Sequence, residues 1–201
     1  MQPARAKRRS APASAPLRGR VSLRDYTVGD YDPGRGFFTR AVWHLINTWI
    51  IRNDALPFSR LRVFLLRLFG ARIGAGVVMQ HGINVKYPWN LAVGDHSWIG
   101  ESVWLDTLGE ITIGSNVVVS QGAFLLTGNH DWSDPLFGLR VQPIILEDEC
   151  WIGAGALVCP GVRVGSQAVL SAGSVATGDL APHKIHVGNP AQPVRDRVVR
   201  R

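Results

Sequence analysis

His130 is the residue whose chemistry and sequence position most directly suggest a catalytic role. It stands between Asn129 and Asp131, where a segment of about residues 131–143 interrupts an otherwise regular pattern. Imidazole titrates near neutral pH and can therefore take the proton from an attacking alcohol. We expect His130 to act as a general base, with Asn129 and Asp131 either binding the alcohol substrate or shaping the turn.

The remaining candidate nucleophiles and metal ligands give weaker signals. Cys150 occupies a small inward position of the pattern described below, and Cys159 has no histidine in its sequence context, so neither is expected to be a nucleophile. No pair of histidines has a spacing typical of metal ligands, and no metal site is expected. The six histidines stand at positions 44, 81, 96, 130, 183 and 186.

A six-residue period dominates the chain from Ile73 onward. An aliphatic residue recurs at every sixth position, a small or apolar residue follows it four positions later, and glycine often comes directly after it. Three such hexapeptides make a triangular coil, and successive coils stack at the strand spacing of about 4.8 Å with the aliphatic residues inward. The series is Ile73, Met79, Val85, Val93, Ile99, Leu105, Ile113, Val119, Leu125, Leu146, Ile152, Val158, Val164, Leu170 and Ala176.

The starting positions of the coils predict the domain organisation. Coils begin at residues 73, 93, 113, 146 and 164, so the first two steps are two residues longer than a coil of about 18 residues, and the third contains a loop. The pattern predicts a parallel β-helix of about five coils over residues 73–182, with the loop at 131–143 and residues 183–201 as a C-terminal tail.

Stacking the outward corner residues gives three ridges along this predicted prism. Two are apolar and suggest subunit contacts or a ligand wall: Val78, Trp98, Val118, Trp151 and Val169, and Asn84, Trp104, Phe124, Leu157 and Val175. The third is polar and contains Asn90, Glu110, His130, Arg163 and Ala181. In this register Glu110 lies one coil below His130 and is a candidate for orienting the imidazole.

The region before the repeats has a different composition. Residues 1–21 form a basic tail expected to be disordered, and residues 22–72 form an arm with two predicted helices, Phe37–Arg52 and Arg60–Phe69, the second capped by Ser59. The second helix carries an apolar side that we expect either to dock on the domain or to lie at a membrane surface. That side contains Leu61, Phe64, Leu65 and Leu68.

The charge distribution and the apolar runs limit the possible partners and location. The net charge of +7 comes almost wholly from six basic side chains in residues 1–20, so a nucleic-acid-binding domain is not expected. No stretch has the form of a cleaved signal peptide, and the longest apolar run is too short to span a bilayer. Two cysteines make no disulfide framework. These features favour a cytoplasmic protein, with the inner face of the membrane as a possible location.

The repeat pattern resembles that of the hexapeptide-repeat acyltransferases. From Leu23 to Val199 the chain is most similar to the acetyltransferases of colanic-acid and related exopolysaccharide synthesis, on segments that include Tyr87-Pro88-Trp89, Thr127-Gly128-Asn129-His130-Asp131 and Gly188-Asn189-Pro190-Ala191. The resemblance implies an all-β, left-handed β-helix, acetyl-CoA as co-substrate, His130 as the catalytic residue, and a homotrimer with coenzyme A in the groove between subunits.

The resemblance also implies which residues meet the coenzyme. A lysine that follows the threonine in many relatives is replaced here by Gly178, so one coenzyme contact is expected to be missing. The matching positions are Trp151, Gly153, Ala172, Gly173, Thr177, Gly178 and Arg195.

The expected reaction is transfer of an acetyl group to a sugar hydroxyl of an exopolysaccharide or lipid-linked oligosaccharide precursor. Alternatives are a small-molecule acceptor such as an amino acid, a simple sugar or an antibiotic, and a non-catalytic β-helix scaffold. A zinc-dependent hydratase on the same fold is disfavoured by the histidine spacing.

Overall fold

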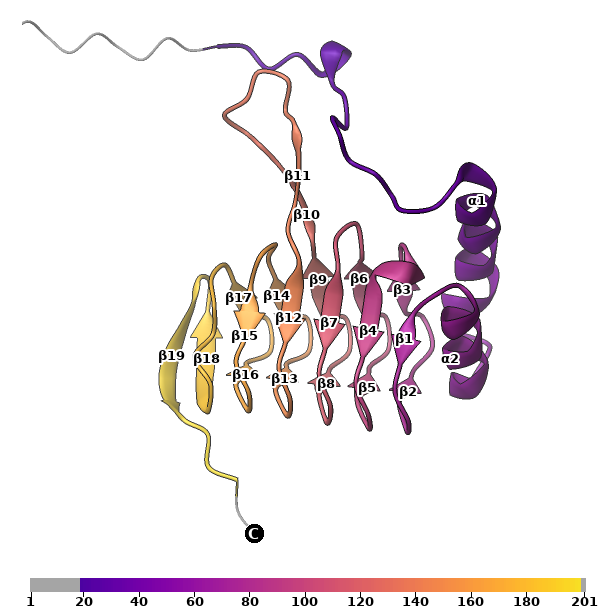
Figure 1. Ribbon diagram of the computed structural model, residues 1–201. Helices are drawn as coiled ribbons and strands as arrows, with labels where there is room; N and C mark the ends of the chain where they lie inside the picture. The colour runs from indigo at the N-terminus through magenta and orange to yellow at the C-terminus, as the bar shows by residue number, and fades with distance from the viewer. Residues whose placement is uncertain (1–18, 200–201) are drawn as a thin grey trace, which may run out of the picture.

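Three parallel β-sheets wrap around one axis to form a triangular prism (Figure 1). The computed structural model describes residues 19–199, so the predicted disorder of the basic tail falls almost wholly outside the described residues. The predicted class, an all-β parallel β-helix preceded by two short helices, is confirmed. Each coil contributes one short strand to each of three faces, which we call the first, second and third face in the order in which the chain meets them.

The strands of each face pair in parallel along the prism. The first face contains β1 (Arg72–Ile73), β4 (Leu91–Val93), β7 (Ile111–Ile113), β12 (Ile144–Leu146) and β15 (Arg163–Val164). The second contains β2 (Val78–Met79), β5 (Trp98–Ile99), β8 (Val118–Val119), β13 (Trp151–Ile152), β16 (Val169–Leu170) and β18 (Lys184–Gly188). The third contains β3 (Asn84–Val85), β6 (Trp104–Asp106), β9 (Phe124–Leu126), β14 (Leu157–Val158) and β17 (Val175–Ala176).

The prism continues past the five predicted coils. Strand β18 pairs in parallel with β16, and Leu180 bridges to Val164, so a partial sixth coil follows the fifth. Strand β19 (Ala191–Asp196) then pairs antiparallel with β18. The segment that the repeat pattern assigned to a C-terminal tail thus covers the last edge of the second face.

The hydrophobic core is the predicted series of aliphatic residues. From Ile73 to Ala176 none of these side chains is more than 9% exposed. Complete burial of one such side chain contributes about 1.5–3 kcal/mol. Because every coil adds three of them to a single column, the core grows along the axis and holds the three faces together.

The turns between coils are closely stacked and joined by short polar side chains. The backbone N–H of Ala75 donates to Asp95 Oδ1 at 2.7 Å, and that of Ser115 donates to Asp148 Oδ1 at 2.8 Å. At Gly94 a Cβ atom would lie 2.6 Å from the carbonyl carbon of Gly114. The absence of a side chain there allows adjacent coils to approach to strand spacing.

Two of the three predicted ridges are confirmed by the strand register. Trp98 pairs with Val118 and Trp151 with Val118 and Val169 on the second face, and Trp104 pairs with Phe124 on the third.

The prediction of a third, polar ridge is wrong. Arg163 pairs with Ile145, and Ile145 pairs with Thr112, so Arg163 does not stack on Glu110. The two-residue additions of the first two coils lie at this corner. Counting a fixed number of residues from the strand of the third face therefore does not reach the same position in every coil.

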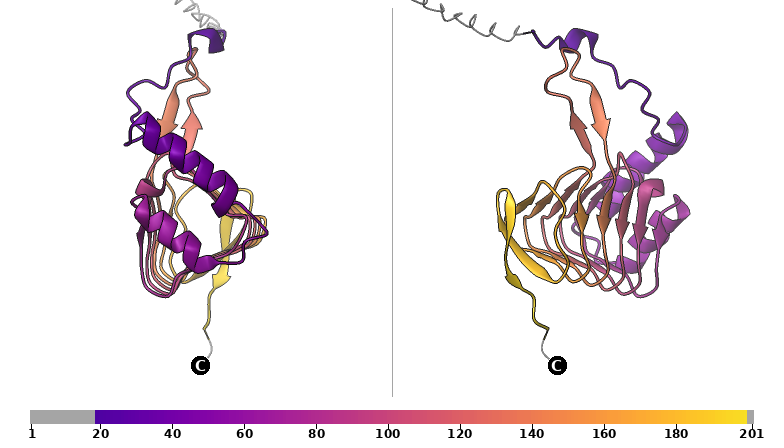
Figure 2. Two further views of the ribbon diagram at one scale, coloured as in Figure 1. Left: turned by 90° about the vertical axis from the view of Figure 1, so that its right-hand side faces the viewer. Right: turned by 60° about the vertical axis from the view of Figure 1, so that its left-hand side comes forward.

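The two helices lie across the N-terminal end of the prism (Figure 2). Helix α1 (Phe37–Ile46) runs into one wide turn, Asn47–Ile51, and α2 (Ser59–Leu68) follows. Between them the buried guanidinium of Arg62 donates to three carbonyls, those of Ile51, Asn53 and Leu56. Burial lowers the pKa of Arg62.

Side chains of these helices satisfy the open backbone groups of the first coil on all three faces. Arg67 donates to the carbonyl of Ile73 at 2.7 Å. Trp43 Nε1 donates to the carbonyl of Val85 at 2.9 Å. The backbone N–H of Met79 donates to Ser59 Oγ at 2.9 Å. The prediction that Ser59 caps α2 is therefore wrong, because Phe58 takes the capping position and the serine hydroxyl serves the first coil instead.

The helices also expose a large apolar surface. Helix α2 buries Arg62, Val63 and Leu66, so most of its predicted apolar side faces away from the prism. We call the exposed set the helix apolar surface: Phe37, Phe38, Val42, Leu45, Trp49, Phe58, Leu61, Phe64 and Leu68. Among residues 19–199 no helix is long and apolar enough to cross a membrane.

A glycine-to-alanine pair tests the close stacking of the coils. Gly94→Ala is expected to lower the free energy of unfolding by roughly 1–3 kcal/mol, because the added methyl group meets the backbone of the next coil. Gly178→Ala is the control, since no atom lies within 4 Å of its Cβ position and its φ lies outside the left-handed region; its effect should be within about 0.5 kcal/mol. Equal denaturation midpoints at matched protein concentration would contradict the stacking argument.

Candidate active site

All of the extra residues of the first three coils leave the prism at one corner, the turn from the third face to the first. In the first coil they form a short helical turn, Pro88–Asn90, and in the second a turn around Leu108. In the third coil the chain leaves as an antiparallel hairpin, β10 (Gly128–His130) and β11 (Leu139–Val141). The excursion therefore begins at Gly128 rather than Asp131, and His130 lies on its first strand.

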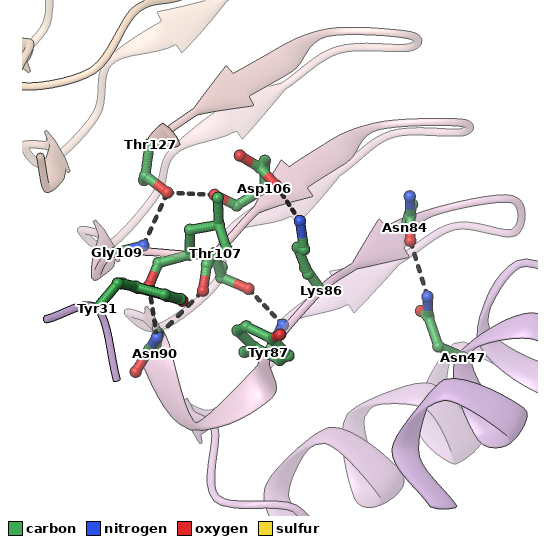
Figure 3. Close-up of polar contacts among 11 residues, drawn as sticks. Tyr31, Asn47, Asn84, Lys86, Tyr87, Asn90, Asp106, Thr107, Gly109 and Thr127 are labelled. Atoms are coloured by element: carbon green, nitrogen blue, oxygen red, sulfur yellow. Dashed lines mark hydrogen bonds and ion pairs between the residues drawn. The ribbon is translucent and has the colours of Figure 1, made fainter. Parts of the chain in front are cut away.

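Two buried threonines hold this corner together (Figure 3). Thr127 Oγ1 donates to the carbonyl of Asp106 and accepts from the N–H of Gly109 at 2.9 Å. Thr107 Oγ1 accepts from the N–H of Tyr87 at 2.7 Å. Both threonines are fully buried, so each satisfies backbone groups that the wider turns would otherwise leave without partners.

The N-terminal arm is attached to the same corner. The hydroxyl of Tyr31 donates to the carbonyl of Leu108 at 3.0 Å, and Asn90 Nδ2 donates to that carbonyl at 3.1 Å (Figure 3). Burial raises the pKa of Tyr31, so its hydroxyl remains a proton donor at neutral pH. Lys86 Nζ lies 3.7 Å from the buried carboxylate of Asp106, which limits where the ammonium group can lie.

The imidazole of His130 is held in one orientation by its own hairpin. Nδ1 lies 3.0 Å from the carbonyl oxygen of Phe137, and the two rings stack with centroids 4.5 Å apart. Tyr26 contributes a second ring, with centroids 5.7 Å apart. Because a carbonyl can only accept, Nδ1 carries the hydrogen, and Nε2 keeps the lone pair that a general base requires.

Glu110 does not lie in position to orient this ring. Its carboxylate pairs with Arg72 at 2.6 Å, and both side chains are more than half exposed. The strand after the hairpin, β12, occupies the place above the Glu110 turn, because Ile144 pairs with Ile111. The carbonyl of Phe137 takes the role that the sequence assigned to Glu110.

Asn129 and Asp131 make contacts that shape the turn. Asn129 Oδ1 accepts from the N–H of His130 at 2.8 Å. Asp131 Oδ1 accepts from the Ser133 hydroxyl at 2.6 Å, and Oδ2 pairs with Arg140. The hydrogen bonds from Ser133 lower the pKa of Asp131, with Arg140 adding to the effect. Both side chains thus fix the hairpin on which the histidine is mounted.

His130 borders a cavity of about 340 Å³, which we call the histidine cavity. The arm, α1, the wide turns of the first two coils and the hairpin each supply part of its wall. Its volume is within the range typical of small-molecule sites. The lining residues are Tyr26, Val28, Tyr31, Pro33, Arg40, Lys86, Tyr87, Leu108, His130 and Leu139.

The sequence patterns did not predict most of these lining residues. Tyr31 and Leu108 are 77 positions apart and meet only because the arm folds back along the prism. Arg40 belongs to a helix whose pattern gives no sign of a site. The feature of the sequence that could have predicted part of the wall is the two-residue addition in each of the first two coils. These additions place Tyr87 and Leu108 at the corner where the hairpin leaves.

The residues matched to coenzyme contacts lie elsewhere on the prism. Trp151 is on the second face, 47% exposed, and Gly153, Ala172 and Gly173 lie at the turn from the second face to the third. In a triangular coil the second face is opposite the corner that carries His130. A Cβ atom on Gly153 would lie 2.4 Å from the backbone nitrogen of Ala172, so this glycine is also required for stacking.

The other three matched positions lie toward the C-terminal end. Thr177 and Gly178 follow β17 and belong to the same corner as His130, on a later coil. Arg195 lies on the edge strand β19 and is exposed. Within one chain the structure therefore does not bring the candidate base and the full set of coenzyme positions together.

Neither cysteine has the environment of a nucleophile. Cys150 is buried in the core, as predicted, and burial raises its pKa to about 12. Burial also raises the pKa of Cys159. Thiols in these environments stay protonated at neutral pH. Among the described residues, no group of three or more His, Cys, Asp or Glu side chains is arranged to hold a metal ion.

Comparison with known proteins identifies the family. Residues 143–177 match the family described as the hexapeptide repeat of succinyl-transferase. The chain is 40% identical over 157 residues to "Putative colanic acid biosynthesis acetyltransferase WcaF" of Escherichia coli (strain K12), across 78% of this chain and 86% of that protein. The chain belongs to the hexapeptide-repeat acetyltransferases. The resemblance read from its motifs is confirmed.

Solved structures of other acetyltransferases share the fold. A maltose O-acetyltransferase from Clostridium difficile 630 is 26% identical with a TM-score of 0.70, covering 81% of this chain and 88% of that one. A hexapeptide-repeat acetyltransferase from Vibrio cholerae, solved in complex with acetyl coenzyme A, is 22% identical with a TM-score of 0.75, covering 89% and 100%.

Proposed function

We propose that this acetyltransferase moves the acetyl group of acetyl-CoA to a sugar hydroxyl of an exopolysaccharide or lipid-linked oligosaccharide precursor. The observation that carries the proposal is His130, mounted with Nε2 free beside a cavity of about 340 Å³. The names of the E. coli protein and of the maltose O-acetyltransferase support a saccharide acceptor. The complex of the V. cholerae structure supports acetyl-CoA as the donor.

The proposed reaction is a direct transfer. Nε2 of His130 removes the proton of the acceptor hydroxyl while the hydroxyl oxygen attacks the thioester carbonyl, and the tetrahedral intermediate then collapses and releases the thiolate of coenzyme A. The imidazolium returns its proton to that thiolate. The Nδ1–H bond to Phe137 stabilises the charged ring during this step. A protein thiol is not needed, in agreement with the raised pKa values of both cysteines.

Replacement of the histidine tests the proposed base. His130→Ala is expected to lower the rate of coenzyme A release in the presence of a saccharide acceptor by about 10²–10⁴-fold, because general-base assistance is lost. His183→Asn, at an exposed histidine whose positive φ asparagine tolerates, should keep full activity. Both variants should retain the thermal midpoint of the wild type. Near-normal turnover by His130→Ala would exclude this residue as the base. If the wild type transferred the acetyl group only to an amine or an antibiotic, the proposal of a saccharide acceptor would be refuted.

We further propose that the active enzyme is a homotrimer whose sites are shared between protomers. The candidate coenzyme positions on the second face lie opposite the His130 corner of the same chain, so a neighbouring copy must supply one of the two. The exposed side chains Trp98, Trp104 and Trp151 support this assembly, because they form apolar ridges that a second protomer would cover.

Mixed assemblies test whether sites are shared. His130→Ala and Ala172→Glu should each be inactive alone, the second because its carboxylate repels the phosphates of coenzyme A. When the two chains are unfolded and refolded together in equal amounts, about a quarter of the sites would combine an intact histidine with an intact coenzyme surface. Activity should then return to about that fraction. Absence of any recovery in assemblies with the mass of a mixed trimer would show that each site belongs to one chain.

We also propose that the helix apolar surface contacts an anionic membrane at its cytoplasmic face. Nine exposed apolar side chains lie on α1, α2 and the segment between them, at one end of the prism. Arg52 and Arg60 are exposed on the same segment, and residues 1–20 add six basic side chains without an acid. Aromatic residues with flanking cations suit a lipid–water interface. This contact would bring a lipid-linked acceptor to the enzyme.

Vesicle flotation tests the membrane contact. The wild type should float with vesicles that contain phosphatidylglycerol, and Trp49→Ser combined with Phe64→Ser should weaken the partition at least about tenfold, because two interfacial aromatic side chains are lost. Trp132→Ser, which removes an aromatic residue 82% exposed on the hairpin, is the matched control and should float normally. A wild type that stays in the aqueous fraction would refute the contact.

A further inference from the structure

A second cavity adjoins the histidine cavity and extends along α1 to Trp104. It has a volume of about 310 Å³, and we call it the helix cavity. Arg40, Lys86 and Tyr87 line both cavities. In Figure 3, Lys86 and Tyr87 lie between the Asn47–Asn84 pair of the helix cavity and Tyr31 of the histidine cavity. The two cavities therefore meet at a pair of cationic side chains.

The charged side chains that line the two adjoining cavities are all basic. Arg40 and Lys86 lie at its centre, and His44 and Arg52 line the part along α1. Among its lining residues there is no aspartate or glutamate. The carboxylate of Asp106 is buried behind Lys86 at 3.7 Å and offsets only that one positive charge, and Asp32 lies near Tyr31 without lining either cavity.

Arg40 is also incompletely satisfied. Its Nε atom is buried and has no hydrogen-bond partner among the described residues, and the guanidinium forms no ion pair there. A buried donor without a partner costs free energy, and no carboxylate among the described residues competes with a ligand for this guanidinium. Guanidinium groups bind phosphate oxygens with paired, charge-assisted hydrogen bonds, and an ammonium group adds a point charge.

We infer that Arg40 and Lys86 form a subsite for a phosphate group attached to the acceptor sugar. The inference rests on the proposed function and narrows its acceptor to a sugar phosphate ester. The phosphate lies where the two cavities meet, the sugar fills the histidine cavity with one hydroxyl at Nε2 of His130, and the group beyond the phosphate extends along α1. Both a nucleoside-diphosphate sugar and a lipid-diphosphate-linked sugar have this chemistry.

Binding measurements test the subsite without turnover. With the enzyme saturated with coenzyme A, which occupies the coenzyme surface, calorimetry with glucose 1-phosphate should detect binding, whereas glucose should bind at least about tenfold more weakly. Arg40→Gln and Lys86→Gln should each weaken binding of the phosphate about tenfold or more, and Arg40→Lys should weaken it less because the charge remains. Arg24→Gln, which removes an exposed arginine of the arm outside both cavities, is the matched control and should leave binding unchanged.

Transfer assays then separate this inference from the proposed function and identify the source of the phosphate. Coenzyme A release is compared for a free oligosaccharide, UDP-glucose and a polyprenyl-diphosphate-linked oligosaccharide in detergent. Arg40→Gln should raise KM for the phosphorylated acceptors about tenfold or more, while kcat and KM for acetyl-CoA stay unchanged. Whichever of the two phosphorylated acceptors gives the faster coenzyme A release shows whether a nucleotide or a lipid extends along α1.

Two outcomes would overturn the subsite. One is equal binding of glucose 1-phosphate and glucose by the wild type. The other is an Arg40→Gln variant that changes KM equally for free and phosphorylated acceptors. By contrast, preferential phosphate binding through Arg40 without acetyl transfer to any sugar would leave the subsite intact and refute the proposed function instead.

Discussion

The whole structure depends on the backbone hydrogen bonds between successive coils. Each coil must place three short strands in register with those of its neighbours, so residues cannot be added within a face without breaking a ladder. Extra residues can leave only at a corner. In this chain the additions to the first three coils leave at a single corner, from the third face to the first, and buried Thr107 and Thr127 satisfy the backbone groups that the wider turns expose. The histidine and its cavity are consequences of this restriction.

The same constraint explains how the imidazole of His130, the candidate base, obtains its orientation. A hairpin that leaves a rigid corner carries both the histidine and its partner, because β10 and β11 bring the Phe137 carbonyl to Nδ1 of His130. Asp131 and Ser133 stabilise the tip through local hydrogen bonds. The orientation of the ring therefore depends on contacts within one hairpin, whereas the cavity beside it depends on the arm, α1 and two earlier coils.

The open end of the prism creates a second requirement. The first coil has no coil before it, and its exposed backbone groups would invite pairing with another chain. Arg67, Ser59 and Trp43 satisfy one group on each face, so these three side chains are turned toward the prism. Much of the ordinary apolar side of the helices is left facing outward as a result. This exchange accounts for the helix apolar surface and places Arg40 over the histidine cavity.

The sequence by itself determined the coil, its core and its family, because a hexad period depends only on which side chain follows which along one strand and one turn. It also singled out His130 as the candidate base, since the histidine stands where the period stops. Only the tertiary structure decided which residues surround it. Glu110 and His130 were matched by counting from the preceding strand, and the count failed because the third coil leaves this corner as a hairpin from Gly128, which the pattern does not show. Tyr31, Arg40 and Lys86 reach the site through contacts between segments far apart in the chain, and local patterns carry no information about such contacts.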